Sequence, residues 1–546
     1  MDVADAHLAA ARKAWGDRWT RAIGDRELRK QIFHEFQQEF PCHPDIVLYE
    51  SMSGAKMMDS PFSLFLHEYG APDKRRDARL HVWSVRSEET VPPEFLRAPG
   101  VLRVKRHTPE YMYYLARATR IVGNSTLPEY FVRRPEQYYL NTWHGIGYKT
   151  LGRTDANPLG AGLSVSNMLQ STHAISPCGF MTHVHMHGFA MRNTYVGQFA
   201  EAGYPRIDAI LNTGREAKLA LLQILGCSEE RPVVTYAPTW RGDGFDGERL
   251  RHDLASLADL DCSTVFLGHH MMLKHVDVAN LEGVIVPPDH VNTNELLAAT
   301  DVLITDYSSI FFDFQVTGRP IVHYLYDYAE YSTARGLTLE SDELPGIVVT
   351  TSEQLVEAVE HELTRSRACA PSYYGNVERF NPFDKGESSK NVADWFFRAD
   401  PSGVNVLKYL NVRPRTVFWG GRLGDTSATD AYFDEVEAEL SRDAVDVTVF
   451  VSRTVRRNDV AIERIRRLGG SVSVVVRDDY NFGTTRAEEE ARSKEAGERS
   501  QLEVMAYDEI YAREYRRIFG DVKFDHVRIF PGQSFFWRRL AAEAHK

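Results

Sequence analysis

Four segments of the chain place polar side chains directly after short apolar runs. The first is NTWHGIGYKTLG, in which Gly145 and Lys149 follow His144. A histidine at a strand end can act as a general base, because its unperturbed pKa lies near working pH. The glycine lets a ligand approach the backbone, and Lys149 can pair with a phosphate. The alternative is a histidine that only caps its own loop by hydrogen bonds.

The second and third segments come from the middle of the chain. VVTYAPTWRGD leads an apolar run into Thr239 and Arg241, and TVFLGHHMMLK leads one into His269 and His270. A guanidinium offers a planar fork of donors that suits phosphate, although a lone Arg more often belongs to a surface ion pair. Adjacent side chains on an extended segment point to opposite faces, so we expect one of the two histidines to face the site.

The fourth segment is DVLITDYSSIFFDFQVTGRPIV. A buried strand is expected to stop at Thr305, and Asp306, Ser308 and Ser309 precede a helical pattern. Serine hydroxyls and free N–H groups at a helix start can hold an anion. The same residues are also common as helix caps, and both interpretations stay open.

Strand-like runs alternate with helical patterns along the chain, which is typical of parallel α/β sheets. One series lies before residue 212, led by a helical pattern over residues 4–40, and a second lies after it. A third follows residue 412, with RTVFWGG, VDVTVFVS, GSVSVVVR and FDHVRIF. We therefore expect an α/β protein with Rossmann-like units over residues 1–212, 213–402 and 413–546. Ligands bind beyond the carboxyl ends of strands in such sheets, where the four segments lie.

Composition narrows the class of protein. The 546 residues are 43% hydrophobic and carry a net charge of −12, so we expect a folded protein that does not bind nucleic acid. The five cysteines contain no CxxC pair, which indicates a reduced compartment and no thiolate zinc site. We find no apolar run long enough for a membrane span and no signal peptide.

The motifs NTWHG, GYPRID, YAPTWR, TDYSSIFFDF, YDYAEY and LPG follow one another in this order. Over about residues 45–400 the chain resembles the CDP-glycerol glycerophosphotransferase family, the teichoic acid and capsule polymerases. The resemblance implies a GT-B fold, with residues 1–212 as the acceptor-side half and residues 213–402 as the donor-binding half. It also implies transfer of glycerol phosphate or ribitol phosphate from a CDP-alditol to a polymer hydroxyl, with release of CMP. Such phosphoryl transfer depends mainly on placement and neutralisation of charge.

The resemblance assigns roles to individual residues. The catalytic histidines of the family fall on His144, the expected general base, and on His270, or on His269 if the register slips by one residue. The pyrophosphate and nearby groups would be held by Gly145, Lys149, Arg206, Asp208, Thr239, Arg241, Thr305, Asp306, Ser308 and Ser309. The usual His-Gly-Thr-Pro-Leu-Lys reads HGIGYK here, which leaves the identity of the acceptor open.

The resemblance also implies the partners. We expect no required cofactor, a CDP-glycerol or CDP-ribitol donor, and a lipid-linked or glycan polymer acceptor. The expected place is the cytoplasm, peripheral at the inner face of the cell membrane, and the oligomeric state stays open. His183, His185 and His187 alternate as residues on one face of a strand do, but no carboxylate or Cys partner is evident, so no metal is expected.

Residues 413–546 resemble a different group, the acceptor half of a glycosyltransferase, through WGGRLGDTSATDAYFDEVEAEL and FDHVRIFPGQSFFW. A complete second enzyme would also need a donor half. Truncation of a longer bifunctional protein is the favoured interpretation, and a packing or acceptor-docking module is the other. Two alternative functions for the chain remain: a nucleotide-sugar glycosyltransferase on the same fold, and a non-catalytic binding or scaffold protein.

Overall fold

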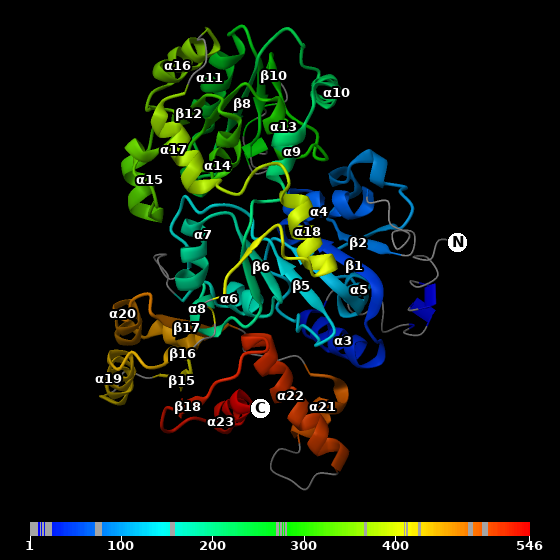
Figure 1. Cartoon of the computed structure of the whole chain (residues 1–546), viewed down its shortest axis with the longest axis vertical. Coiled ribbons are helices and arrows are strands. Elements are labelled where there is room, and N and C mark those ends of the chain that lie inside the picture. Colours follow the sequence, from blue (N-terminus) through cyan, green and yellow to red (C-terminus); the bar gives the residue numbers. More distant parts are fainter. Residues whose placement is uncertain are drawn as a thin grey trace.

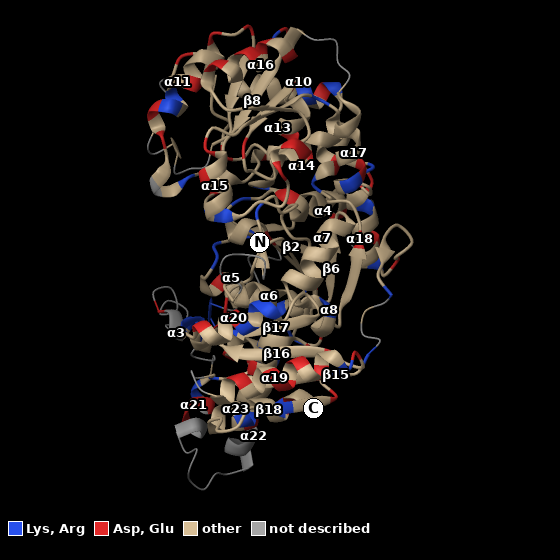
Figure 2. Cartoon of the chain, turned by 90° about the vertical axis from the view of Figure 1, so that its left-hand side faces the viewer, with Lys and Arg blue, Asp and Glu red and all other residues tan. Residues whose placement is uncertain are grey.

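The computed structural model contains three mainly parallel sheets that follow one another along the long axis of the molecule (Figure 1). It describes residues 9–10, 12–13, 16, 25–70, 79–152, 159–268, 272–273, 276, 278, 281–364, 369–408, 410, 413–423, 427–478, 484–493 and 501–546. Acidic and basic residues are interspersed over all three units (Figure 2). The predicted α/β fold class is confirmed.

The first sheet has eight strands in the order β14-β7-β6-β5-β4-β1-β2-β3. The strands are β1 (His43–Glu50), β2 (Leu80–Ser84), β3 (Val101–Val104), β4 (Ala118–Gly123), β5 (Tyr138–Asn141), β6 (His173–Ser176), β7 (Gln198–Glu201) and β14 (Asn405–Val406). Central strand β1 places Leu48 opposite Val82 and Ile121, and all three are fully buried. The α-helices of this unit are α3 (Arg26–Glu39), α4 (Asp59–Gly70), α5 (Pro109–Arg117), α6 (Gly162–Leu169), α7 (Gly179–His183), α8 (Met191–Thr194) and α9 (Ile207–Asn212).

The second sheet has six parallel strands in the order β10-β9-β8-β11-β12-β13. The strands are β8 (Val233–Ala237), β9 (Ser263–Phe266), β10 (Val284–Ile285), β11 (Val302–Thr305), β12 (Ile321–Tyr324) and β13 (Ile347–Val349). The α-helices are α10 (Arg215–Leu225), α11 (Gly247–Ala258), α13 (Thr293–Ala299), α14 (Ile310–Phe314), α15 (Tyr328–Arg335), α16 (Ser352–Thr364) and α17 (Pro371–Phe380). The hydrophobic side chains of β8 and β11 are buried between these helices, which explains why both strands read as continuous apolar runs.

The third sheet has four parallel strands in the order β17-β16-β15-β18. The strands are β15 (Arg415–Gly421), β16 (Asp446–Ser452), β17 (Val472–Arg477) and β18 (His526–Ile529). The α-helices are α19 (Ser427–Ser441), α20 (Asp459–Arg467), α21 (Arg486–Ser493), α22 (Gln501–Phe519) and α23 (Phe535–Ala541).

The three sheets have the same connectivity around their first strand. The chain starts in the middle, moves outward through two strands, and then crosses to the other side of the first strand, as in Rossmann-like folds. The crossing points lie between β1 and β4, between β8 and β11, and between β15 and β18. Ligands bind at the carboxyl ends of the strands at such points. We therefore expect the functional site at the first two crossing points.

The chain returns to the first unit after completing the second sheet. Helix α18 (Ser388–Arg398), which the sequence places in the donor half, packs on α4, and β14 then pairs antiparallel with β7. Yellow α18 lies beside blue α4 in Figure 1. In the part of the chain that the structure describes, no helix is both long and apolar enough to cross a membrane. Of the predicted helical pattern over residues 4–40, helix α3 is described, and most residues before Asp25 lie outside the described ranges.

Candidate functional site

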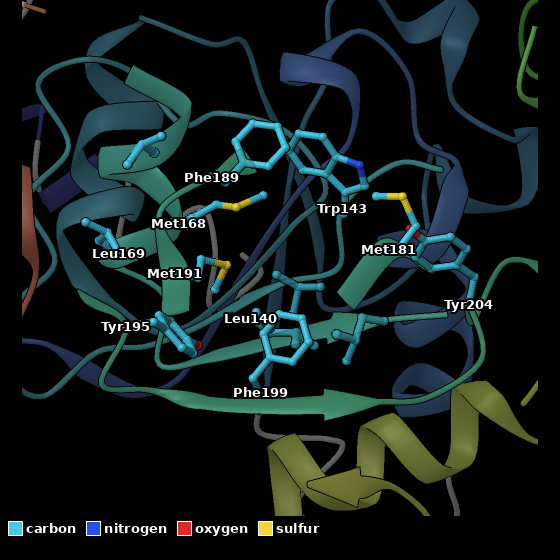
Figure 3. Close-up of a cluster of buried hydrophobic side chains, with 14 of the residues drawn as sticks. Leu140, Trp143, Met168, Leu169, Met181, Phe189, Met191, Tyr195, Phe199 and Tyr204 are labelled. Carbon is cyan, nitrogen blue, oxygen red and sulfur yellow. The ribbon is translucent and has the colours of Figure 1, made fainter. Parts of the chain in front are cut away.

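His144 follows β5 at the carboxyl edge of the first sheet. The residue before it, Trp143, adopts the left-handed region with a φ of 57°. Its ring lies in a buried hydrophobic cluster, 4.9 Å from the ring of Phe189 between centroids (Figure 3). The buried Trp143 side chain thus fixes the backbone at this turn. The next side chain, that of His144, is exposed to solvent.

The ring of His144 is oriented by a backbone group. Its Nδ1 atom lies 2.9 Å from the carbonyl oxygen of Asn124, just past β4. A carbonyl oxygen can only accept, so Nδ1 carries the proton and neutral Nε2 keeps its lone pair. Solvent reaches the ring, but protein surrounds its other sides, and this burial lowers the pKa of His144. These features suit a general base that acts through Nε2.

Asn124 also organises the loop after β1. Its Oδ1 accepts a hydrogen bond of 2.8 Å from the backbone N–H of Met52, and the hydroxyl of Ser125 accepts one of 2.7 Å from Ser53. Met52, Ser53 and Gly54 all have positive φ, so the loop is a tight left-handed turn. The first crossing point, between β1 and β4, is thus directly connected to the histidine.

A pocket of about 180 Å³ lies between the first two units. Its lining residues are Trp143, His144, Gly145, Ile146, Gly147, Tyr148, Lys149, Leu151, Tyr307 and Ser309. The last two follow β11, at the second crossing point. Burial lowers the pKa of Lys149, whose ammonium lies 5.7 Å from the ring centroid of Tyr331. The pocket thus unites the first and fourth predicted segments.

Gly145 lets the two units approach each other. Its φ is 146°, a conformation that side chains rarely adopt. A Cβ atom there would lie 3.2 Å from the hydroxyl oxygen of Ser309 and 3.3 Å from Nη2 of Arg206. The conformation therefore favours glycine, and a side chain here would require Ser309 and Arg206 to shift by a few tenths of an ångström.

The glycine loop is hydrogen-bonded to the second unit. The N–H of Thr338 donates to the carbonyl of Tyr148 at 2.9 Å, and its hydroxyl donates to the carbonyl of Gly147 at 2.8 Å. The N–H of Thr150 donates to the carbonyl of Gly336 at 3.3 Å. These bonds fix the glycine loop, which lines the pocket, to the second unit.

Arg206 joins the two units through a buried ion-pair network. Its Nη1 donates to Asp59 of α4 at 3.0 Å, and its Nη2 donates to Asp313 of α14 at 2.8 Å. Its side chain is 6% exposed, and the ring of Tyr204 lies 4.8 Å away. Burial raises the pKa of Asp313, although the pairing with Arg206 opposes this shift. Both ends of the Arg206 guanidinium are thus occupied by protein carboxylates.

Asp208 caps helix α18. Its carboxylate accepts hydrogen bonds from the backbone N–H groups of Ser388 at 3.1 Å and Ser389 at 2.6 Å. Acceptors at this position satisfy N–H groups that have no partner within the helix. The GYPRID motif thereby ties the returning helix to the first unit.

Arg241 lies in an aromatic and acidic enclosure of the second unit. Its Nη1 lies 2.9 Å from Asp306, and its Nε donates to Asp327 at 2.8 Å. Tyr307 and Tyr331 stack at 3.8 Å between centroids, and both rings lie about 5 Å from the guanidinium. Arg241 is 6% exposed, so it contributes to the architecture behind the pocket wall.

The other predicted residues of the second unit surround the crossing point between β8 and β11. Asp306 accepts from the N–H of Thr239 at 2.9 Å, and the hydroxyl of Thr305 donates to the carbonyl of Ala237 at 2.9 Å. The hydroxyl of Ser308 accepts from the N–H of Ile310 at 3.4 Å. The bonds of Asp306 and Thr305 link the ends of β8 and β11, and the bond of Ser308 lies at the start of α14. His269 and His270 lie outside the described residues.

The assumption that His183, His185 and His187 alternate on a strand is wrong. His183 ends α7, and the other two lie in a π-helical turn, Val184–Gly188. His185 is buried against Trp143, and burial lowers its pKa to about 3. The ring centroids of His183 and His187 lie 4.3 Å apart, with the two ring planes tilted by 41°. Within the described residues, no group of three or more His, Cys, Asp or Glu side chains is placed to hold a metal ion.

Four site residues were missing from the predicted set: Asn124, Asp59, Asp313 and Tyr307. Asn124 directly follows the strand in TRIVGNS, so the expectation that site residues follow strands, which led to His144, also applied to Asn124. Asp313 and Tyr307 stand inside the TDYSSIFFDF motif, but only the fold brings Asp59 and Asp313 to Arg206.

Known proteins resemble the first two units. Residues 32–398 match the model of a family described as CDP-Glycerol:Poly(glycerophosphate) glycerophosphotransferase. A teichoic acid poly(glycerol phosphate) polymerase of Bacillus spizizenii is 27% identical over 374 residues, which cover 65% of this chain and 92% of that protein. The polymerase of the same name from Bacillus subtilis is 27% identical over 384 residues, or 66% of this chain, and the chain spans only 50% of that relative.

A solved structure of the wall teichoic acid polymerase TagF has the same fold. It superposes with a TM-score of 0.61 at 23% sequence identity, over 72% of this chain and 98% of that one. The predicted GT-B arrangement of two Rossmann-like halves is confirmed by this likeness and by the two sheets.

Proposed function

The chain belongs to the CDP-glycerol:poly(glycerophosphate) glycerophosphotransferase family, and we propose that it moves an alditol phosphate from a CDP-alditol to the hydroxyl of a growing teichoic-acid-like or capsular polymer. The pocket between the halves carries this proposal. It places His144 and Lys149 opposite Tyr307 and Ser309 at the carboxyl ends of β5 and β11. A base and a cation thus share a pocket with the Ser309 hydroxyl, between two Rossmann-like halves.

His144 is the general base in this proposal. Its Nε2 accepts the proton of the acceptor hydroxyl while that oxygen attacks the β-phosphorus of the donor. The bond between this phosphorus and the bridging oxygen breaks, and CMP leaves with the bridging oxygen. Lys149 and the hydroxyl of Ser309 lie in the same pocket and would interact with the phosphate oxygens, where charge neutralisation matters most.

The buried charged residues have a different part in the proposal. Arg206, Asp208, Arg241 and Asp306 were expected to contact the donor, but their observed partners are protein groups. We assign them to positioning: Arg206 joins the halves, Asp208 secures α18, and the pair of Arg241 with Asp306 holds the strand ends of the donor half. Thr239, Thr305 and Ser308 belong to the same framework. His270, or His269 after a one-residue slip, remains the proposed second catalytic histidine.

A nucleotide-sugar glycosyltransferase is the alternative on the same fold. It would need a carboxylate in the donor half to bind a ribose. Asp306, Asp313 and Asp327 lie near the cleft, but each is paired with an arginine. These pairings favour the phosphotransferase.

The finer assignments complete the proposal. Residues 1–212 bind the acceptor, and residues 213–402 bind CDP-glycerol or CDP-ribitol without a further cofactor. The acceptor is a lipid-linked or glycan polymer, which would bring the protein to the inner face of the cell membrane as a peripheral protein.

Donor turnover tests the proposal. Purified full-length protein is incubated with CDP-glycerol, CDP-ribitol or UDP-glucose and a glycerol-phosphate oligomer, and CMP or UDP release is followed by chromatography. We expect CMP release with a CDP-alditol, coupled to extension of the oligomer. Turnover of UDP-glucose alone would instead establish the glycosyltransferase.

A further inference from the structure

Helix α6 is the first α-helix described after His144, and residues of the third unit hold both of its ends. We propose that the unit over residues 413–546 is a clamp that fixes α6 and thereby the acceptor side of the cleft. The family match ends at residue 398, so this part lies outside the matched region. The role in acceptor binding rests on the proposed function, whereas the clamp itself does not.

Asp478 holds the first turn of α6. Its Oδ2 accepts a hydrogen bond of 3.2 Å from the backbone N–H of Leu163. A Cβ atom on Gly162 would lie 2.9 Å from the same oxygen and 3.0 Å from the carbonyl oxygen of Val476. The glycine therefore allows β17 to approach the helix backbone. A carboxylate at the start of a helix also interacts favourably with its dipole.

Arg456 extends this contact to the segment before the helix. Its Nη1 pairs with the Oδ1 of Asp478 at 2.9 Å, and its Nε donates to the carbonyl of Leu159 at 3.0 Å. Arg453 donates to the carbonyl of Asp478 at 3.0 Å. The chain thus enters α6 along a surface made by the third unit.

The last turn of α6 is held by α22 and the residues after it. A Cβ atom on Gly520 would lie 2.1 Å from the carbonyl oxygen of Leu169, so the two backbones are in close contact. The side chain of Gln170 donates to the carbonyl of Arg517 at 3.1 Å. Arg133 of the first unit pairs with Asp521.

A buried ion-pair network connects the part of the third unit that contacts the start of α6 with the part that contacts its end. Glu514 of α22 pairs with Arg477 at the end of β17 at 2.6 Å and with Arg517 at 2.8 Å. Glu514 is 1% exposed, and the arginines lower its pKa although burial opposes this shift. The strand that contacts the start of α6 is therefore coupled to the helix that contacts its end.

The strand ends of the third sheet are used for this packing. At its crossing point, a Cβ atom on Gly421 would lie 2.1 Å from the amide oxygen of Gln533, which fills the space beside the glycine. Arg477 pairs with Glu514, and Asp478 caps α6. In a nucleotide-binding half these positions would face a ligand. Their protein partners favour a clamp over a second ligand site.

Hydrogen exchange of the full-length protein tests the clamp. In Asp478→Ala, we expect amide exchange over residues 159–169 to rise about tenfold, since one charge-assisted hydrogen bond and one ion pair are lost. Exchange in the donor half should not change. Asp478→Asn keeps an acceptor for Leu163 and should restore much of the protection. Glu435→Ala, an exposed carboxylate on α19, is the matched control.

Kinetics with CDP-glycerol and a glycerol-phosphate oligomer test the consequence for acceptor binding. In Asp478→Ala we expect KM for the oligomer to rise about fivefold, which corresponds to the loss of about one hydrogen bond. KM for CDP-glycerol and kcat should stay within about twofold of the wild-type values. Gly162→Ala should act in the same direction, because its methyl group displaces the cap without removing a charge. Unchanged exchange over residues 159–169 in both variants would overturn the clamp. A fall in kcat at unchanged oligomer KM would overturn its acceptor role.

Discussion

The Nδ1 atom of His144 lies 2.9 Å from the carbonyl oxygen of Asn124, and this contact determines which ring nitrogen can accept a proton. The Oδ1 atom of the Asn124 side chain also accepts a hydrogen bond of 2.8 Å from the backbone N–H of Met52. One residue at the β1/β4 crossing point therefore sets both the tautomer of the base and the shape of the neighbouring loop. The geometry leaves Nε2 as the basic atom.

Removing this base should stop the chemistry without preventing donor binding. In His144→Gln we expect kcat for CMP release to fall by about 100- to 10,000-fold, the usual contribution of a positioned general base, while KM for CDP-glycerol changes little. His252→Gln, an exposed histidine of α11, is the control and should retain full activity. Wild-type kcat in His144→Gln would show that the base is another residue.

The pH dependence of kcat/KM should report the lowered pKa of His144. Burial makes protonation less favourable, so the folded pKa lies below the ordinary 6.5. The base works only when neutral, so activity should be constant above pH 6.5 with respect to this group and should fall as pH drops through the lower pKa. A stopped assay of CMP release from pH 4.5 to 8 measures this acidic fall in kcat/KM. A midpoint at or above 6.5 would contradict the assignment.

Much of the fold could be predicted because apolar runs mark buried parallel strands. The runs over β1, β4, β5, β8 and β11 are bounded by turn residues, and their ends carry the polar groups of the site. Strands β3, β7, β13 and β14 have two to four residues each, and only β7 and β3 have more than one buried position. With at most two buried positions each, these strands give a weak apolar signal, whereas β5 and β11, each four residues long, have three and four buried positions.

The site was harder to predict, because residue types do not reveal partners. Arg206 looks like a phosphate ligand in GYPRID, yet it pairs with Asp59, 147 residues earlier, and with Asp313, 107 residues later. The fold of the first unit brings Asp59 to Arg206, and the contact between the halves brings Asp313 to it. Arg241 is a similar case, since Asp327 lies 86 residues away.

The Arg206 network should contribute strongly to stability. In Arg206→Met, two buried carboxylates lose their cation, and we expect a loss of about 3–5 kcal/mol in the free energy of unfolding. Urea denaturation followed by circular dichroism measures this loss. Arg215→Met, an exposed position on α10, should change stability by less than about 0.5 kcal/mol. Equal stability of the two variants would mean that the network is solvated.

Gly145 should tolerate no side chain. In Gly145→Ala, the methyl group meets Ser309 and Arg206 at 3.2–3.3 Å in a backbone conformation that disfavours alanine. We expect stability to fall by about 1–3 kcal/mol and kcat/KM by at least about tenfold. Gly375→Ala in α17 is the control, because it has open space and should be neutral or slightly stabilising. Equal activity of the two variants would show that the halves need not meet at Gly145.

Asp384 should make the protein less stable as pH rises. Burial raises its pKa from 3.8 to about 7, with its Oδ1 accepting from the N–H of Tyr204 at 2.8 Å. Between these pH values the folded state holds a proton that the unfolded state has lost, so stability falls as pH rises from about 4 to about 7. Asp384→Asn mimics the protonated form and removes this dependence. Its stability relative to wild type should therefore increase by about 2 kcal/mol between pH 5 and pH 8 in urea denaturation. Asp259→Asn, an exposed control on the surface of the donor half, should show no such trend. If the stability difference between Asp384→Asn and wild type did not depend on pH, the buried carboxyl of Asp384 would be ionised throughout this range.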